Sequence, residues 1–302
     1  MPTGFRVHQF ARIVAGFAFL LVIAGGLVTS TSSGLAVPDW PLSYGQVFPP
    51  MVGGIRFEHA HRVIAGVVAI LTLLLALWLQ RSASSSLAKR LGWAALGAVV
   101  LQELLGGATV LRHLPPAVSI AHACLGQVFF SLVVSAAVTT SAAWRAAAPA
   151  PHDDAARLHR LAALTTIVLG LQLAAGASLR HTGAALGWHL ALAGLVVIHV
   201  LLLGRHISFQ HQGRPLLMWP LALLVGLLVT QLALGVGALL AVSAASYATT
   251  QWSWWPVALR TAHVAVGAAL LATSCVVTVC ACRLVLRVEP ATAVASVGAG
   301  AA

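Results

Sequence analysis

Residues 60–80, AHRVIAGVVAILTLLLALWLQ, decide the fold class of this chain. Arg62 is the only charged residue in the stretch, whose length matches the roughly 20 residues that a helix needs to cross a bilayer. Seven further stretches of this kind occur at 10–30, 92–111, 119–143, 161–179, 186–204, 217–241 and 260–282. Because a chain in lipid must satisfy its backbone polar groups internally, the sequence predicts an all-α integral membrane protein with eight transmembrane helices.

The composition supports this fold class and excludes a soluble domain. Of the 302 residues 60% are hydrophobic and 8% are charged, whereas soluble domains carry about 25% charged residues. Most basic residues fall at the N-terminus and in alternate connections, which places both termini in the cytoplasm and the protein in the plasma membrane. The net charge of +11 is therefore explained by topology and anionic lipid, without nucleic acid as a partner.

An internal repeat divides the chain into two halves. Ala24-Gly25 matches Ala175-Gly176, and Ala121-His122 matches Ala262-His263. Likewise, residues 102–106, QELLG, match residues 231–235, QLALG. We therefore expect two pseudo-symmetric four-helix bundles, residues 1–145 and 161–302, joined by a cytoplasmic linker at 146–160. The small residues would allow the helices to pack closely.

Four histidines share one position in the repeat. His61, His122, His189 and His263 fall in the first turns of the second, fourth, sixth and eighth predicted helices. All four would lie at a similar depth in the outer leaflet, where an ionisable side chain is costly and usually functional. Two histidines on facing helices are a common means of holding a haem iron. The alternatives are four independently hydrogen-bonded histidines or a copper or zinc site, although no carboxylate or thiolate cluster accompanies them.

Basic residues on the outer side favour haem as the ligand. Guanidinium groups bind carboxylates well, and two haems would bring four propionates. The candidate propionate ligands are Arg56, Arg62, Arg112, Arg180 and Arg260.

One carboxylate distinguishes the two halves. Glu58 precedes His61 by three residues and would share its helix face. The equivalent position in the second half is Leu186, and Arg62 is matched by Leu190. A carboxylate beside a haem could relay protons or stabilise a cationic transition state, whereas a glutamate at a helix end could simply face water. The asymmetry suggests chemistry in the first half and electron transfer or structure in the second.

Several of these motifs together resemble the haem A synthase family over nearly the whole chain. The predicted outer loop at residues 34–45, GLAVPDWPLSYG, resembles the first outer loop of that family, and residues 58–62, EHAHR, resemble its Glu-x-x-His-Arg motif. Ala121-His122 and Ala262-His263 match its histidines on the fourth and eighth helices.

The resemblance implies oxidation of the C8 methyl group of haem O to a formyl group, giving haem A for terminal oxidases. His61 and His122 would then face haem O, with Glu58 as the catalytic carboxylate, and His189 and His263 would ligate a haem b cofactor. The reaction would also require an electron donor, and a haem O synthase is an expected partner.

This sequence departs from the family pattern at two places. Many members carry a cysteine pair where Val37 and Ser43 stand here, so that disulfide cannot form. No arginine follows His189, which leaves His199 as an alternative ligand on the same helix. One alternative is a di-haem b-type electron carrier, which does not need Glu58 in one half only. The other is a haem-free transporter with inverted repeats, against which the even number of helices per repeat and the shared depth of the histidines argue.

Overall fold

The computed structural model describes residues 3–245 and 254–288 and confirms the eight predicted membrane-spanning helices. The helices are α1 (Thr3–Ser30), α2 (Ile55–Arg81), α3 (Ser86–Leu111), α4 (Pro116–Thr139), α6 (Ala155–Thr182), α7 (Leu186–Gln210), α8 (Pro215–Ala245) and α9 (Trp254–Leu284). Each begins and ends within a few residues of a predicted apolar stretch. Residues 289–302, which belong to the predicted second half, lie outside the described residues, as do 1–2 and 246–253.

Local signals in the sequence explain several helix ends. Ser85 caps α3 because its side-chain oxygen accepts a hydrogen bond from the Ala88 N–H. Pro116 occupies the first turn of α4, where its missing N–H costs nothing. Gly183 ends α6 at φ 72°, a left-handed conformation that glycine adopts without strain.

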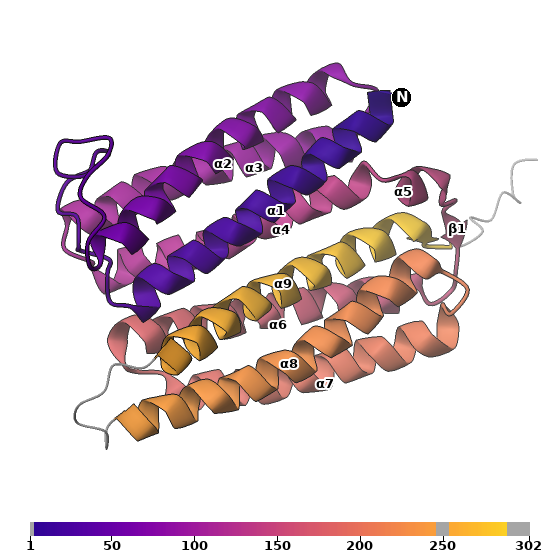
Figure 1. Cartoon of the computed structure of the whole chain (residues 1–302). Helices are drawn as coiled ribbons and strands as arrows, with labels where there is room; N and C mark the ends of the chain where they lie inside the picture. The colour runs from indigo at the N-terminus through magenta and orange to yellow at the C-terminus, as the bar shows by residue number, and fades with distance from the viewer. Residues whose placement is uncertain (1–2, 246–253, 289–302) are drawn as a thin grey trace, which may run out of the picture.

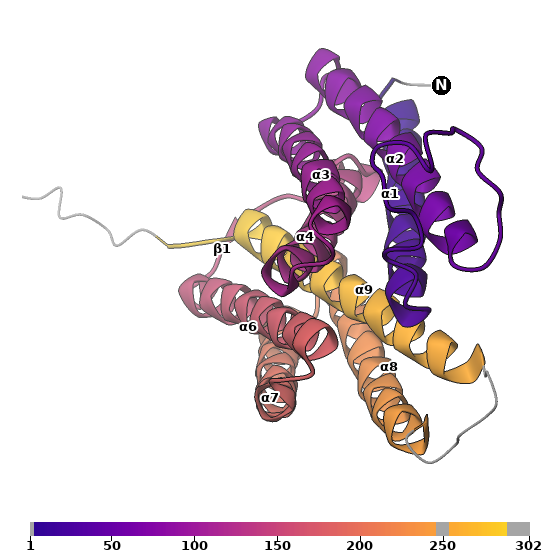
Figure 2. The same cartoon turned by 90° about the vertical axis from the view of Figure 1, so that its left-hand side faces the viewer.

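The helices form two groups, α1–α4 and α6–α9, which lie one above the other in Figure 1. Within each group, successive helices contact one another, and the first contacts the fourth. Helix α9 is the most buried of the eight spans, because it also contacts α1 and α4 of the other group (Figure 2). The apolar core of the first group accordingly includes Ala268 and Ala272 of α9.

Two short elements at the predicted linker were not indicated by the apolar pattern: a helix that ends at the first linker residue and a strand within the linker. Helix α5 (Ala142–Ala146) follows α4, and strand β1 (Ala150–Pro151) pairs in parallel with strand β2 (Val285–Leu286) at the end of α9. These elements lie at the end of the molecule that holds the N-terminus, whereas the α1–α2 loop lies at the opposite end (Figure 1). The linker is therefore anchored to the end of α9. The pseudo-symmetry of the halves and the cytoplasmic location of the termini stay predictions.

Labelling with a membrane-impermeant maleimide tests the orientation. Val47→Cys in the exposed α1–α2 loop should react in intact cells, and Ala83→Cys between α2 and α3 should react only after lysis. Cys282→Ser provides the background, since Cys282 is the exposed cysteine. Labelling of Ala83→Cys alone in intact cells would show the reverse orientation.

Candidate functional site

Glu58 and Arg62 lie one turn apart on α2 and form an ion pair with 2.6 Å between Oε1 and Nη2. Glu58 is 3% exposed, so the alternative of a glutamate facing water is excluded. Its Oε2 accepts a hydrogen bond of 2.8 Å from the Val37 N–H in the α1–α2 loop. Burial of this carboxylate is therefore compensated by one charged and one backbone donor.

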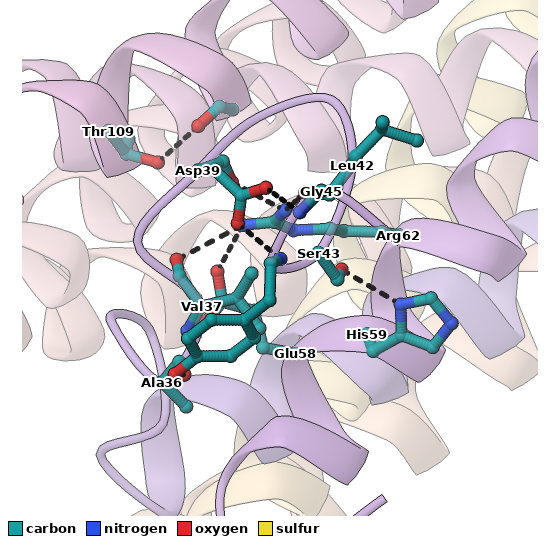
Figure 3. A network of polar contacts seen from close by, with 12 residues as sticks. Ala36, Val37, Asp39, Leu42, Ser43, Gly45, Glu58, His59, Arg62 and Thr109 are labelled. Carbon is teal, nitrogen blue, oxygen red and sulfur yellow. Dashed lines mark hydrogen bonds and ion pairs between the residues drawn. The ribbon is translucent and has the colours of Figure 1, made fainter. Parts of the chain in front are cut away.

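Arg62 also holds the α1–α2 loop directly (Figure 3). Its Nη1 donates to the carbonyl oxygens of Asp39 at 2.7 Å and Leu42 at 2.6 Å, and its Nη2 donates to Val37 O at 3.3 Å. The sequence predicted a propionate ligand at this position and missed the contacts with the loop. Arg62 and Glu58 together fix the loop against the start of α2. Glu58 lies three residues before His61 on this helix.

The loop is closed on itself by polar contacts. The Asp39 carboxylate accepts hydrogen bonds from the Tyr44 N–H at 2.6 Å and the Gly45 N–H at 2.7 Å, while Tyr44 Oη donates to Ala36 O at 2.8 Å (Figure 3). The Gly45 N–H bond is the main cause that lowers the pKa of Asp39, so this carboxylate is ionised at neutral pH. Ser43 Oγ lies 2.9 Å from Nδ1 of the buried His59.

Trp40 attaches the same loop to α3. A Cβ atom placed on Gly107 would lie 2.9 Å from Cδ2 of the Trp40 ring, so the ring rests directly on the helix backbone. The loop is thus held by α2 through hydrogen bonds and by α3 through packing.

Each of the four predicted histidines faces a glycine on the preceding helix. A Cβ atom on that glycine would lie 2.9–3.3 Å from the histidine Cε1, closer than side chains normally approach. The pairs are Gly25 with His61, Gly106 with His122, Gly176 with His189, and Gly235 with His263. The repeat had revealed these glycines, but their contact with the histidines was missed. The structure therefore gives the four imidazoles the same local environment.

The four rings also share an unsatisfied atom. Nδ1 of all four histidines is buried without a hydrogen-bond partner among the described residues. A buried polar atom is costly when it is unpaired, so four of them at equivalent positions point to a missing ligand. Histidines satisfied entirely by the protein would have shown a partner at this nitrogen as well.

The histidines lie close together within each half. The His189 and His263 ring centroids are 6.3 Å apart with planes at 76°, and His61 and His122 are near enough to interact electrostatically. His199 instead approaches the Leu195 carbonyl of its own helix, with Nδ1 at 2.9 Å. The contact with His263 therefore favours His189 over His199 on α7.

Two glutamines support the histidines of α4 and α9. Gln102 Nε2 donates to the backbone carbonyl of His122 at 2.9 Å, and Gln231 Nε2 lies 3.4 Å from His263 Nε2. A Cβ at Gly126 or at Gly267 would lie 3.0 Å from the respective glutamine Nε2, so each glutamine lies tightly against the histidine helix. These glutamines were noticed only as repeat positions.

The remaining outer arginines are spread around the two halves. Arg180 donates to the Thr29 carbonyl of α1 and interacts electrostatically with Arg260, whose Nε is buried without a described partner. Arg56 lies over the Phe57 ring, 4.9 Å from its centroid, and Arg112 follows the last residue of α3. Arg56, Arg112 and Arg180 are exposed, and Arg260 is half-buried.

Comparison with known proteins shows which family this part of the chain resembles. Residues 55–191, from α2 to the start of α7, match the family of cytochrome oxidase assembly proteins. The match covers less than half of the chain. The matched segment contains Glu58, His61, Arg62, His122 and His189.

Its similar proteins share one name, heme A synthase. The protein of Symbiobacterium thermophilum is 31% identical over 190 residues, which cover 59% of this chain and 61% of that protein. That of Alkalihalophilus pseudofirmus is 29% identical, covering 43% and 44%. That of Exiguobacterium sp. is 26% identical over 223 residues, covering 65% and 72%. The alignments with the first two thus span less than two thirds of the relatives' own length.

The ion pair on α2 can be tested by a double-mutant cycle. Arg62→Gln should lower the free energy of unfolding by about 3 kcal/mol, because it leaves the buried Glu58 carboxylate without its cation. Glu58→Gln/Arg62→Gln should recover part of this loss, since no isolated charge then remains. Thermal unfolding of the purified variants gives both values, and equal losses in the single and double variants would contradict the coupling.

The closed loop should respond to acid. Because the pKa of Asp39 is lowered on folding, its bonds are formed at neutral pH and lost as pH falls through that lowered value. Amide hydrogen exchange at Tyr44 and Gly45 should therefore stay protected at pH 5 and lose protection only as the pH falls below the ordinary pKa of an aspartate. If the Asp39→Asn variant kept the same protection at pH 5, the carboxylate would not be the group that holds the loop.

Proposed function

We propose that this protein is a haem A synthase, which oxidises the C8 methyl group of haem O to a formyl group and so supplies haem A to terminal oxidases. The observation that carries the proposal is the set of four buried histidines, each resting on a glycine and each with an unpaired Nδ1. The shared name of the relatives supports the specific reaction.

The residues fit two haems. Metal–nitrogen bonds of about 2 Å would bridge two rings at about the separation of His189 and His263. Because each ring lies against a glycine of the preceding helix, its direction is fixed before the iron is bound. We assign haem b to His189 and His263, and substrate haem O to His61 and His122. Bound haem b would supply electron transfer to the reaction.

Glu58 assigns the chemistry to the first half. Each of its carboxylate oxygens accepts one described hydrogen bond and can accept another, so the group retains proton-accepting capacity close to His61. The Arg62 guanidinium pairs with this carboxylate and fixes its position. In the second half Leu186 replaces Glu58, so the reaction would occur only at the first pair of histidines.

The loop above α2 would exclude water from the first pair. Arg62 and Glu58 hold it from below, and Trp40 packs it against α3, the helix that also supplies Gly106. The same contacts make Arg62 a positioning residue for Glu58 in this proposal, beside its predicted role as a propionate ligand. Arg180 and Arg260 are the strongest candidates for the propionates of haem, and Arg56 and Arg112 are the others.

The domain and membrane assignments follow from this proposal. Residues 1–145 would form the substrate half and 161–302 the cofactor half, with the 146–160 linker and both termini in the cytoplasm. The protein would reside in the plasma membrane, in contact with lipid, an electron donor and a haem O synthase. The di-haem electron carrier is not favoured, because the named relatives are synthases.

Co-expression with a haem O synthase tests the reaction. Chromatography of extracted haems should show conversion of haem O to haem A in cells that contain the wild-type protein. Folded protein with bound haem and unchanged haem O would overturn the proposal.

A carboxylate exchange tests the role of Glu58. Glu58→Gln should retain bound haem and the Val37 hydrogen bond but lower conversion at least about 100-fold, the range expected for loss of a general acid–base group. Glu103→Gln on α3 is the matched control, since it removes the same charge from another membrane helix. If Glu58→Gln converted haem O as well as Glu103→Gln and the wild type, Glu58 would be excluded from the chemistry.

A further inference from the structure

A cavity of about 330 Å³ opens at the end of the bundle that holds the N-terminus, remote from the histidines. It lies between the first turns of α1, the α2–α3 connection, the end of α4 with α5, and the end of α9. Its described lining consists of Gly4, Val7, Ser82, Ala83, Ser84, Ser85, Thr139, Thr140, Trp144, Arg145 and Arg283. The cavity therefore joins both halves of the protein at the level where a spanning helix leaves the bilayer.

Both charged groups in this lining are cationic. Arg145 comes from α5 and Arg283 from the last turn of α9, and none of the described lining residues is acidic. The cavity thus concentrates positive charge without a neutralising carboxylate among its described lining residues. Such an arrangement favours an anionic ligand.

The two guanidinium groups are held in place with donors to spare. Arg145 Nη1 donates to Thr140 O, which is adjacent to the end of α4. The Arg283 guanidinium lies 4.8 Å from the centroid of the Trp144 ring, and its Nη2 donates to Trp144 O at 3.4 Å. Arg283 Nε is buried without a hydrogen-bond partner among the described residues. Since a guanidinium carries five N–H donors, each arginine is oriented by few bonds and can still bind an anion.

The start of α3 adds neutral donors to the same cavity. Ser84 and Ser85 line it immediately before the first turn of the helix, where backbone N–H groups have no acceptor within the helix. Ser84 Oγ lies 2.7 Å from Ser82 Oγ, which itself donates to Leu79 O at 3.1 Å, so the hydroxyl protons of this pair are engaged within the protein and the backbone N–H groups are the free donors. The positive end of the α3 dipole favours an anion in this cavity, as the two arginines do.

We propose that this cavity binds a phosphate group. Phosphate accepts several hydrogen bonds at once and pairs with planar guanidinium groups, which matches two arginines beside a helix start. Basic pockets between membrane helices bind phospholipid head groups, and the phosphate of an anionic phospholipid lies at this level. Bound phosphate would connect Arg145 of the first half with Arg283 of the second.

Native mass spectrometry of the purified full-length protein tests the site with three probes. Phosphatidylglycerol carries the phosphate, diacylglycerol has the same chains without it, and inorganic phosphate has no chains. Wild-type protein should retain phosphatidylglycerol and release diacylglycerol. Arg145→Gln and Arg283→Gln should each weaken phosphatidylglycerol binding about tenfold, as expected for loss of a charge-assisted hydrogen bond.

Two further variants keep the test decisive if either arginine variant is unstable. Ser84→Asp leaves both arginines in place and should weaken binding at least as much by charge repulsion. Arg287→Gln lies near Arg283 but outside the described lining, and it should bind like wild type. The same pattern with inorganic phosphate in place of lipid would assign the site to a soluble phosphate. Two results would overturn the proposal. One is equal binding of phosphatidylglycerol and diacylglycerol without binding of inorganic phosphate, and the other is identical binding by Ser84→Asp and Arg287→Gln with both phosphate probes.

Discussion

The close approach of an imidazole ring to a bare helix backbone is the contact on which the rest of this structure depends. It occurs four times, always between a histidine and a glycine of the preceding helix. A larger side chain at the glycine would push the ring away or separate the helices. The contact therefore sets both the spacing of neighbouring helices and the direction of the ring, and it leaves one ring nitrogen buried and unpaired.

The same constraint links packing to the proposed chemistry. Each ring is held in place and has one nitrogen without a hydrogen-bond partner among the described residues. Binding of a ligand by such a ring costs little reorganisation. The two halves share this arrangement but differ at the start of their second helix. There α2 carries the Glu58–Arg62 pair and its loop, and α7 carries leucines. The two proposed haem sites therefore share the contact between histidine and glycine, and only the first has an adjacent carboxylate.

The sequence was informative where a single physical requirement controls the pattern. The demand for internal backbone hydrogen bonding in lipid predicted all eight spans, and the repeat predicted which histidines are equivalent. The folding of the α1–α2 loop onto Arg62 was missed, since an outer arginine pairs equally well with a carbonyl, a carboxylate or a propionate. Helix α5 and the β1–β2 pairing were missed because they are too short to produce a periodic pattern. The central position of α9 likewise depends on contacts between halves that no local pattern encodes.

The central claim, that the four histidines form two independent haem sites, is tested most directly by haem counting combined with electron paramagnetic resonance of the oxidised protein. With haem O supplied, the wild-type protein should bind two haems per chain, each iron low-spin with two histidine ligands. His263→Ala should remove one of these signals and His122→Ala the other, with the second signal unchanged in each variant. A protein that binds no haem, or in which either substitution leaves both signals intact, would contradict the account.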